Sequence, residues 1–156
     1  KFKNVWYHGD FIRISKNGSI KIYGRSDATL NPGGVRIGTA EIYRVIEKIG
    51  GISDSLVIGQ SWEDDQRIIL FLKMKKGYMF NEKVVKTAKQ MIKKGCSPRH
   101  VPEIVLETKE IPYTMNGKKV EIAVKKVIEG KAVDNTDSLQ NPQVLDFYKN
   151  ISELTT

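Results

Sequence analysis

Strand-like and helix-like segments alternate along this chain, and glycine, asparagine and proline separate them. An Asn17-Gly18 pair stands between two runs with alternating apolar residues, residues 11–15 and 19–25, and this pattern predicts a β-hairpin. After the hairpin we expect the order helix, strand, strand, helix, strand, helix. Such an order predicts an α+β domain in which helices cover a mostly three-stranded sheet.

Capping residues and glycines set the ends of the expected helices. Thr39 and Asn81 are expected to cap the first and second helices, because their side-chain oxygens can accept a free backbone N–H. Glycines stop each helix, and the third helix begins after Asn116-Gly117. The expected strands cover residues 55–59, 67–74 and 103–108.

Lysine is concentrated in the second half of the chain. The 156 residues hold 26 Lys and Arg against 18 Asp and Glu, a formal charge of +8. Residues 83–131 hold twelve Lys and Arg and five Asp and Glu. A basic segment of this kind attracts polyanions such as nucleic acid, an anionic membrane or a phosphorylated cofactor, or it forms a solvated helix face. The aromatic residues are not interleaved with these lysines, so a freestanding nucleic-acid-binding domain is an alternative with little support.

Composition excludes several classes of protein. The longest aliphatic or aromatic run, residues 68–72, is too short for a membrane-spanning helix. Cys96 is the single cysteine, so no internal disulfide can form, and a reducing compartment, the cytoplasm, fits best. His8 and His100 stand apart without other metal ligands, and we expect no metal site. No G-x-S-x-G motif supports a hydrolytic nucleophile.

Three motifs follow one another in the chain: YHGD at residues 7–10, GRSDATLNPGGVRIGTAEI at residues 24–42 and IPYTMNGK at residues 111–118. Together they resemble the late core motifs of the adenylate-forming acyl-CoA synthetases, which share a superfamily with luciferases and with the adenylation domains of peptide synthetases. The second motif is long and specific, whereas T-x-x-G-K alone is short. The resemblance covers nearly the whole chain.

The resemblance implies that this chain is part of a larger enzyme, and the absence of a methionine before Lys1 agrees with that expectation. Residues 1–27 would be the end of an N-terminal AMP-binding domain plus the hinge, residues 28–133 the C-terminal domain, and residues 134–156 a C-terminal extension. The implied reaction joins a carboxylic acid to Mg-ATP, giving acyl-AMP and pyrophosphate, after which coenzyme A displaces AMP. Acetoacetate is the acid that the closest likeness implies, with acetate or propionate as alternatives.

The resemblance also assigns residues to the adenylation half of this reaction. Asp10 matches the carboxylate that binds the ribose hydroxyls of ATP, and Arg25 matches the arginine near the ribose and phosphates. Asp27 matches the hinge about which the C-terminal domain rotates between the two half-reactions. Lys118 matches the lysine that reaches the site during adenylation, where a cation offsets the charge of two anions brought together. As an alternative, Asp10 is an ordinary turn residue at the start of a strand.

For the coenzyme A half, the family loop that lines the pantetheine tunnel matches Gly33, Gly34 and Arg36. Adjacent glycines leave room for a narrow thiol arm against bare backbone. Lys93 stands where relatives place a cation against the 3′-phosphate of coenzyme A, or it is one more lysine on a solvated helix face. Ala28 departs from the family pattern, which often has a second aspartate at that position.

The isolated chain is expected to fold but to catalyse nothing. The family's site lies between two domains, so the wall that the N-terminal domain supplies is missing, and neither ATP nor coenzyme A is expected to bind tightly. Because Lys118 and Gly34 would serve different half-reactions, we expect them to lie apart rather than in one pocket.

Overall fold

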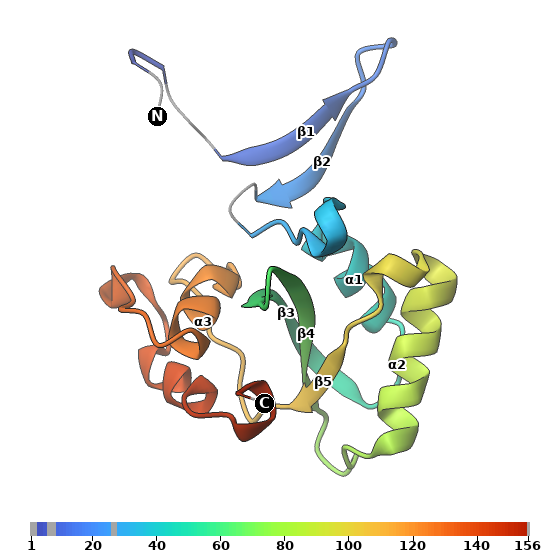
Figure 1. Ribbon diagram of the computed structural model, residues 1–156, viewed down its shortest axis with the longest axis vertical. Helices are drawn as coiled ribbons and strands as arrows, with labels where there is room; N and C mark the ends of the chain where they lie inside the picture. Colours follow the sequence, from blue (N-terminus) through green and yellow to red (C-terminus); the bar gives the residue numbers. More distant parts are fainter. Residues whose placement is uncertain (1–2, 6–8, 26–27, 156) are drawn as a thin grey trace.

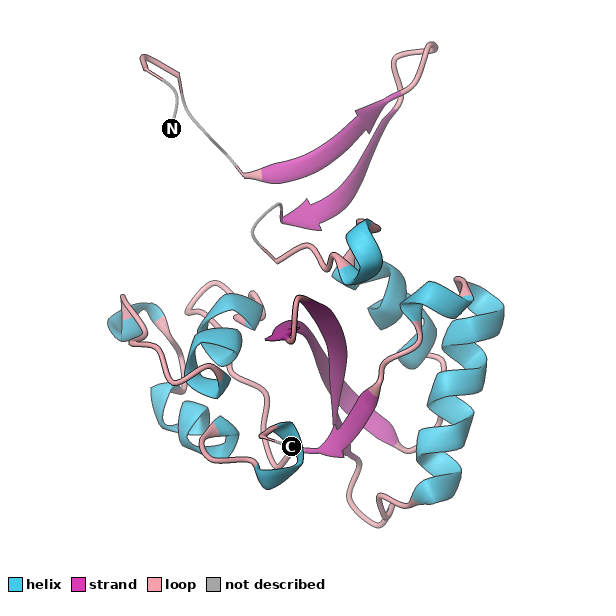
Figure 2. Cartoon of the chain, in the orientation of Figure 1, coloured by secondary structure: helices cyan, strands magenta, loops and turns pink. Residues whose placement is uncertain are grey.

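The computed structural model describes residues 3–5, 9–25 and 28–155 (Figures 1 and 2). Its first element is the predicted hairpin, in which β1 (Asp10–Ile14) pairs antiparallel with β2 (Ile20–Arg25). Figure 1 shows the hairpin projecting from one end of the molecule. The rest of the described chain packs around a separate sheet.

That sheet has three strands, which confirms the predicted α+β class. The strands are β3 (Ile52–Trp62), β4 (Asp65–Met74) and β5 (Ile104–Glu107), in the order β3-β4-β5. β4 is antiparallel to β3 and parallel to β5. β3 and β4 are longer than predicted, because only Glu63 and Asp64 connect them and the pairing continues up to that turn.

Helices cover both faces of the sheet, with α1 (Thr39–Ile46) and α2 (Glu82–Gly95) on one face and α3 (Glu121–Ile128) on the other (Figure 1). Side chains alternate between the two faces along a strand, so the central strand β4 contributes to two cores. Its residues 68, 70 and 72 pack into the core with α1 and α2, and residues 69 and 71 pack into the core with α3. The apolar run at residues 68–72 is therefore a strand buried on both faces.

One of the two predicted helix caps is confirmed. The Asn81 side-chain oxygen accepts the backbone N–H of Val84 at 3.1 Å, at the start of α2. The cap predicted at Thr39 is wrong, because Thr39 is the first residue of α1 and is buried. Gly38 occupies the cap position and supplies no side-chain hydrogen bond. The Thr39 side chain is therefore buried in the protein and does not cap the helix.

The segment after α3 packs onto the sheet and completes the second core. It contains three short 3-10 helices, which are Thr136–Ser138, Pro142–Tyr148 and Ser152–Leu154. Its buried apolar side chains are Leu139, Val144, Leu145, Tyr148 and Leu154. Buried polar groups hold its end, since the Leu154 carbonyl accepts hydrogen bonds from Gln60 Nε2 at 3.0 Å and from Arg67 Nη2 at 2.9 Å. Both apolar packing and buried hydrogen bonds therefore hold this segment against the sheet.

Replacing Leu154 by alanine is expected to lower the free energy of unfolding by about 2–5 kcal/mol, because it removes most of a buried side chain and leaves a cavity. Urea unfolding of the purified chain measures this loss. The exposed neighbour Glu153→Ala is the control. Equal stability of the two variants would show that the end of the chain contributes nothing to the core.

Candidate functional site

Lys118 stands at the end of a tight turn that leads into α3. The backbone N–H of Thr114 donates to the Lys118 carbonyl at 2.8 Å, and that of Gly117 donates to the Thr114 carbonyl at 2.8 Å. The Thr114 hydroxyl accepts the Lys118 N–H at 3.1 Å. Gly117 has a φ of +70°, a conformation that favours glycine. A defined backbone therefore presents Lys118, which is exposed.

The residues on either side of this turn reach one carboxylate on β3. The Tyr113 hydroxyl donates to Asp54 Oδ2 at 2.7 Å, and Lys119 Nζ donates to Asp54 Oδ1 at 2.7 Å. Lys119 Nζ also donates to the Ser55 carbonyl at 2.5 Å and lies 4.2 Å from the centre of the Tyr43 ring. These side chains attach the turn to β3, one of the two edge strands of the sheet, and cover the unpaired edge of that strand.

Tyr43 joins α1 to α3 across the same edge. Its hydroxyl donates to Glu121 Oε1 at 2.9 Å and accepts the Val57 N–H at 3.1 Å. Burial, and after it the charge of Glu121, raises the pKa of Tyr43 well above its usual value. Burial and then the hydrogen bond to Asp54 raise the pKa of Tyr113 as well. Both phenols are therefore protonated, and able to donate, at neutral pH.

A cavity of about 290 Å³ opens beside the Lys118 turn. Lys118 and Lys126 line it, and so does Ala28, the residue that follows the predicted hinge. Lys126 Nζ forms an ion pair with Asp134 Oδ2 at 2.6 Å. Glu121 and Asp134 also line the cavity, so its wall carries both signs of charge, and Lys118 is the exposed cation that it offers to an anionic ligand such as a nucleotide phosphate. The structure thus brings the predicted adenylation lysine and the predicted start of the C-terminal domain to one cavity.

The glycine loop is held by the beginning of β4. The Gly33 N–H donates to both carboxylate oxygens of Asp65, at 3.0 and 2.9 Å, and the Asn31 N–H donates to Gln66 Oε1 at 2.6 Å. Gly34 has a φ of +75°, and no heavy atom lies within 4 Å of the place where a Cβ would stand. The backbone at Gly34 is therefore open to an approaching ligand.

Lys118 and Gly34 belong to turns that are anchored at opposite ends of the β3–β4 pair. Gly34 is not among the residues that line the cavity beside Lys118. Asp54, which holds the Lys118 turn, lies near the beginning of β3, whereas Asp65, which holds the glycine loop, lies at the opposite end of the β3–β4 pair. These two anchor points are separated by about 26 Å along an extended strand.

The other predicted residues lie on the hairpin, in the loop before α1 and on α2. Asp10 and Arg25 stand opposite each other in the register of the hairpin. Arg36 is exposed before α1, and Lys93 is exposed on the last turn of α2. Asp27 lies outside the described residues.

Sequence reasoning missed Asp54, Tyr113 and Lys119. Tyr113 lies inside the motif that ends at Lys118, and Lys119 directly follows it, so their closeness in sequence to Lys118 was an available signal. Asp54 is 59 residues from Tyr113 and 65 from Lys119, and no local pattern marks it.

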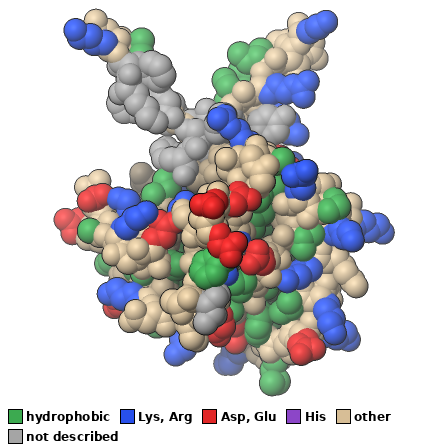
Figure 3. Space-filling view, viewed as in Figure 1, with side chains coloured by type: hydrophobic (Ala, Val, Ile, Leu, Met, Phe, Trp, Pro, Cys, Tyr) green, Lys and Arg blue, Asp and Glu red, His purple; other side chains and the backbone are tan. Residues whose placement is uncertain are grey.

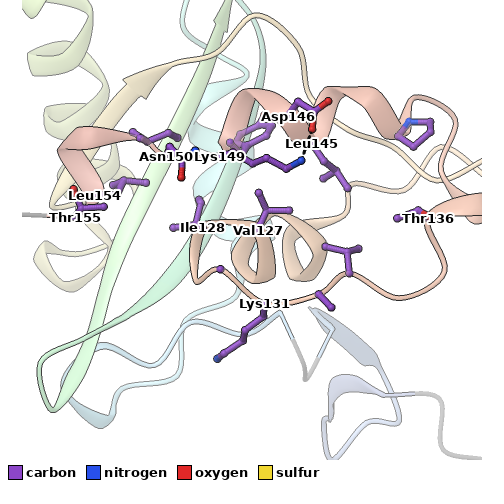
Figure 4. Close-up of a pocket in the computed structure, with 16 residues that line it drawn as sticks. Val127, Ile128, Lys131, Thr136, Leu145, Asp146, Lys149, Asn150, Leu154 and Thr155 are labelled. Carbon is purple, nitrogen blue, oxygen red and sulfur yellow. Dashed lines mark hydrogen bonds and ion pairs between the residues drawn. The ribbon is translucent and has the colours of Figure 1, made fainter.

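Sequence reasoning also missed a cavity of about 680 Å³ between the end of α3 and the C-terminal 3-10 helices (Figure 4). Val127, Ile128 and Leu145 give it an apolar wall, and Lys131 and Lys149 add charge. None of the predicted site residues lines it. Two segments form this cavity together, so no single stretch of sequence indicates it.

Across residues 3–5, 9–25 and 28–155, no helix has the length and apolar character needed to cross a membrane. In the same part of the chain, no group of three or more His, Cys, Asp or Glu side chains is arranged to hold a metal ion.

Comparison with known proteins identifies close relatives, although no protein-family model matches the chain. Acetoacetyl-coenzyme A synthetase from Rhizobium meliloti is 48% identical over 154 residues, and acetoacetyl-CoA synthetase from Gallus gallus is 51% identical over 156 residues. Each match covers 99% of this chain. The solved structure of acetoacetyl-CoA synthetase from Streptomyces lividans matches 97% of the chain with a TM-score of 0.85 and 36% identity. The chain is homologous to the acetoacetyl-CoA synthetases.

This acetoacetyl-CoA synthetase homologue spans about a quarter of the length of its relatives. The matches cover 24% of the Rhizobium meliloti protein and 23% of each of the other two. The chain corresponds to their C-terminal part. The resemblance drawn from the three motifs is therefore confirmed, and with it the predicted fold of a domain of adenylate-forming enzymes.

Proposed function

We propose that this chain is the C-terminal domain of an AMP-forming acetoacetate–CoA ligase. The observation that carries the proposal is the identity of 48–51% with acetoacetyl-CoA synthetases across 99% of the chain. In the proposed reaction, the acetoacetate carboxylate attacks the α-phosphate of Mg-ATP, which gives acetoacetyl-AMP and pyrophosphate. The coenzyme A thiol then attacks the acyl carbonyl, which gives acetoacetyl-CoA and releases AMP.

Lys118 is the proposed cation of the first step. The attack brings a carboxylate and a phosphate together, so a positive charge must offset the charge that develops between them. Lys118 is exposed at the end of a hydrogen-bonded turn and lines an open cavity. These features support a lysine that one domain carries into a site on another domain.

Gly33, Gly34 and Arg36 are the proposed surface for coenzyme A in the second step. The open backbone at Gly34 leaves space for the narrow pantetheine arm. Arg36 and Lys93 are exposed cations that would bind phosphate groups of coenzyme A. Lys118 and Gly34 belong to turns anchored at opposite ends of the β3–β4 pair, and a change of domain orientation would let each act in its own step. This separation supports rotation about a hinge at Asp27 between the two steps.

The hairpin is the proposed end of the N-terminal domain. Ile12 pairs with Ile22 and Ile14 with Ile20, so the four side chains share one face of the hairpin. These isoleucines are 52–65% exposed. A contiguous apolar face of this kind normally packs against further protein. Its exposure supports a hairpin that completes a larger domain, to which Asp10 and Arg25 would contribute ATP contacts.

The nucleic-acid alternative is less well supported. On the face in Figure 3, acidic side chains gather near the centre and Lys and Arg side chains lie around the periphery. A continuous basic stripe, which nucleic acid requires, is not seen on that face. We also propose the cytoplasm as the location, because Cys96 is a free thiol.

Measurement of pyrophosphate release by the full-length enzyme tests the proposed function. Acetoacetate with Mg-ATP is expected to support release, and addition of coenzyme A is expected to give acetoacetyl-CoA and AMP. The isolated 156-residue chain is expected to melt cooperatively and to release no AMP. Faster turnover of acetate or propionate would change the assigned acid, and salt-sensitive DNA binding without any ligase activity would favour the alternative.

A further inference from the structure

The Asp54 carboxylate collects hydrogen-bond donors from its own strand and from both sides of the Lys118 turn. Its Oδ1 accepts from the Ser55 N–H at 2.8 Å and from Lys119 Nζ at 2.7 Å, and its Oδ2 accepts from the Tyr113 hydroxyl at 2.7 Å. The side chain is 21% exposed. An irregularity in the β3–β4 pairing between residues 52 and 54 marks a β-bulge, a feature that redirects side chains.

These contacts determine which way Lys118 points. Tyr113 and Lys119 are bridge partners, so they form the two legs of the turn. Successive side chains of an extended leg point to opposite sides. When Lys119 is directed onto Asp54, its neighbour Lys118 is directed away from the sheet. The burial pattern agrees, because Lys119 is half-buried and Lys118 is exposed.

We propose that Asp54 is a positioning residue for adenylation, which holds both legs of the turn so that Lys118 is presented in one orientation. The proposal rests on the adenylation role proposed above for Lys118. Asp54 acts through Tyr113 and Lys119, and a role confined to the stability of the sheet edge would affect both half-reactions equally. A positioning role affects the formation of acetoacetyl-AMP alone.

The test uses Asp54→Ala in the full-length enzyme. Its kcat for acetoacetyl-AMP formation is expected to fall about 10- to 100-fold, since small misplacements of a reacting group cost this much. The KM for ATP and the rate of acetoacetyl-CoA formation from supplied acetoacetyl-AMP are expected to stay unchanged. Asp54→Asn keeps an oxygen acceptor for Lys119 and a partner for Tyr113, so it is expected to recover most of the adenylation rate. Lys119→Met leaves the Asp54 carboxylate in place and is expected to show the same loss of adenylation rate. This variant replaces Asp54→Ala in the test if Asp54→Ala does not fold.

Glu110→Gln is the matched control. Glu110 Oε1 pairs with Lys73 Nζ at 2.5 Å and accepts the N–H of Ile111 at 3.3 Å, so this half-buried carboxylate–lysine pair lies before the turn formed by residues 113–119. This variant is expected to keep both half-reactions. Equal losses in Asp54→Ala and Glu110→Gln, or equal losses of the two half-reactions in Asp54→Ala and Lys119→Met, would overturn the positioning role while leaving the proposed function intact. A wild-type enzyme that forms no acetoacetyl-AMP would overturn the proposed function and the positioning role together.

Discussion

Replacing Lys118 by alanine in the full-length enzyme is expected to lower the rate of acetoacetyl-AMP formation about 100- to 1,000-fold, the usual effect of removing one group that stabilises developing charge. Lys118 is exposed, so the variant is expected to fold as the wild type does. Its glycine loop is untouched, and the second half-reaction is therefore expected to proceed normally. Pyrophosphate release measures the first step, and supplied acetoacetyl-AMP with coenzyme A measures the second.

The exposed lysine of another helix provides the control for this experiment. Lys94→Ala, on the last turn of α2, removes the same charge from the surface and is expected to keep both steps. If Lys118→Ala lost both half-reactions to the same extent, Lys118 would have no role specific to adenylation.

Replacing Gly34 by leucine is expected to produce the opposite defect. The place where a Cβ would stand has no neighbour within 4 Å, so the side chain can leave the backbone without a clash. The left-handed backbone, with φ of +75°, adds about 1–2 kcal/mol of strain. The leucine would fill the space proposed for the pantetheine arm, and acetoacetyl-CoA formation from acetoacetyl-AMP is expected to fall about 10- to 100-fold. Pyrophosphate release is expected to continue at the wild-type rate.

A second glycine separates backbone strain from loss of the coenzyme A path. Gly77 also has a positive φ, +85°, with no neighbour within 4 Å of a built Cβ. Gly77→Leu therefore carries a similar strain at a site unrelated to the glycine loop. Should it slow the thioester step as much as Gly34→Leu does, the effect at Gly34 would be one of strain rather than of blocked access.

Local signals in the sequence were sufficient to predict the order of the helices and strands along the chain. The Asn17-Gly18 pair predicted the hairpin, and Asn81 predicted the start of α2, because both signals depend on residues within one turn of the chain. The same kind of signal failed at Thr39, where burial rather than capping decides the side chain's surroundings. The lengths of β3 and β4 were underestimated, since strand pairing depends on a partner as well as on local pattern.

The sequence by itself determined the family resemblance and the candidates Lys118 and Gly34, because each lies in a continuous motif. Only the tertiary structure decided that Asp54 lies beneath the turn that carries Lys118, and that Asp65 holds Gly33. Each of these contacts joins residues 32 or more positions apart in the chain. Their existence depends on how strands and turns pack together, and a motif read along the chain contains no record of that packing.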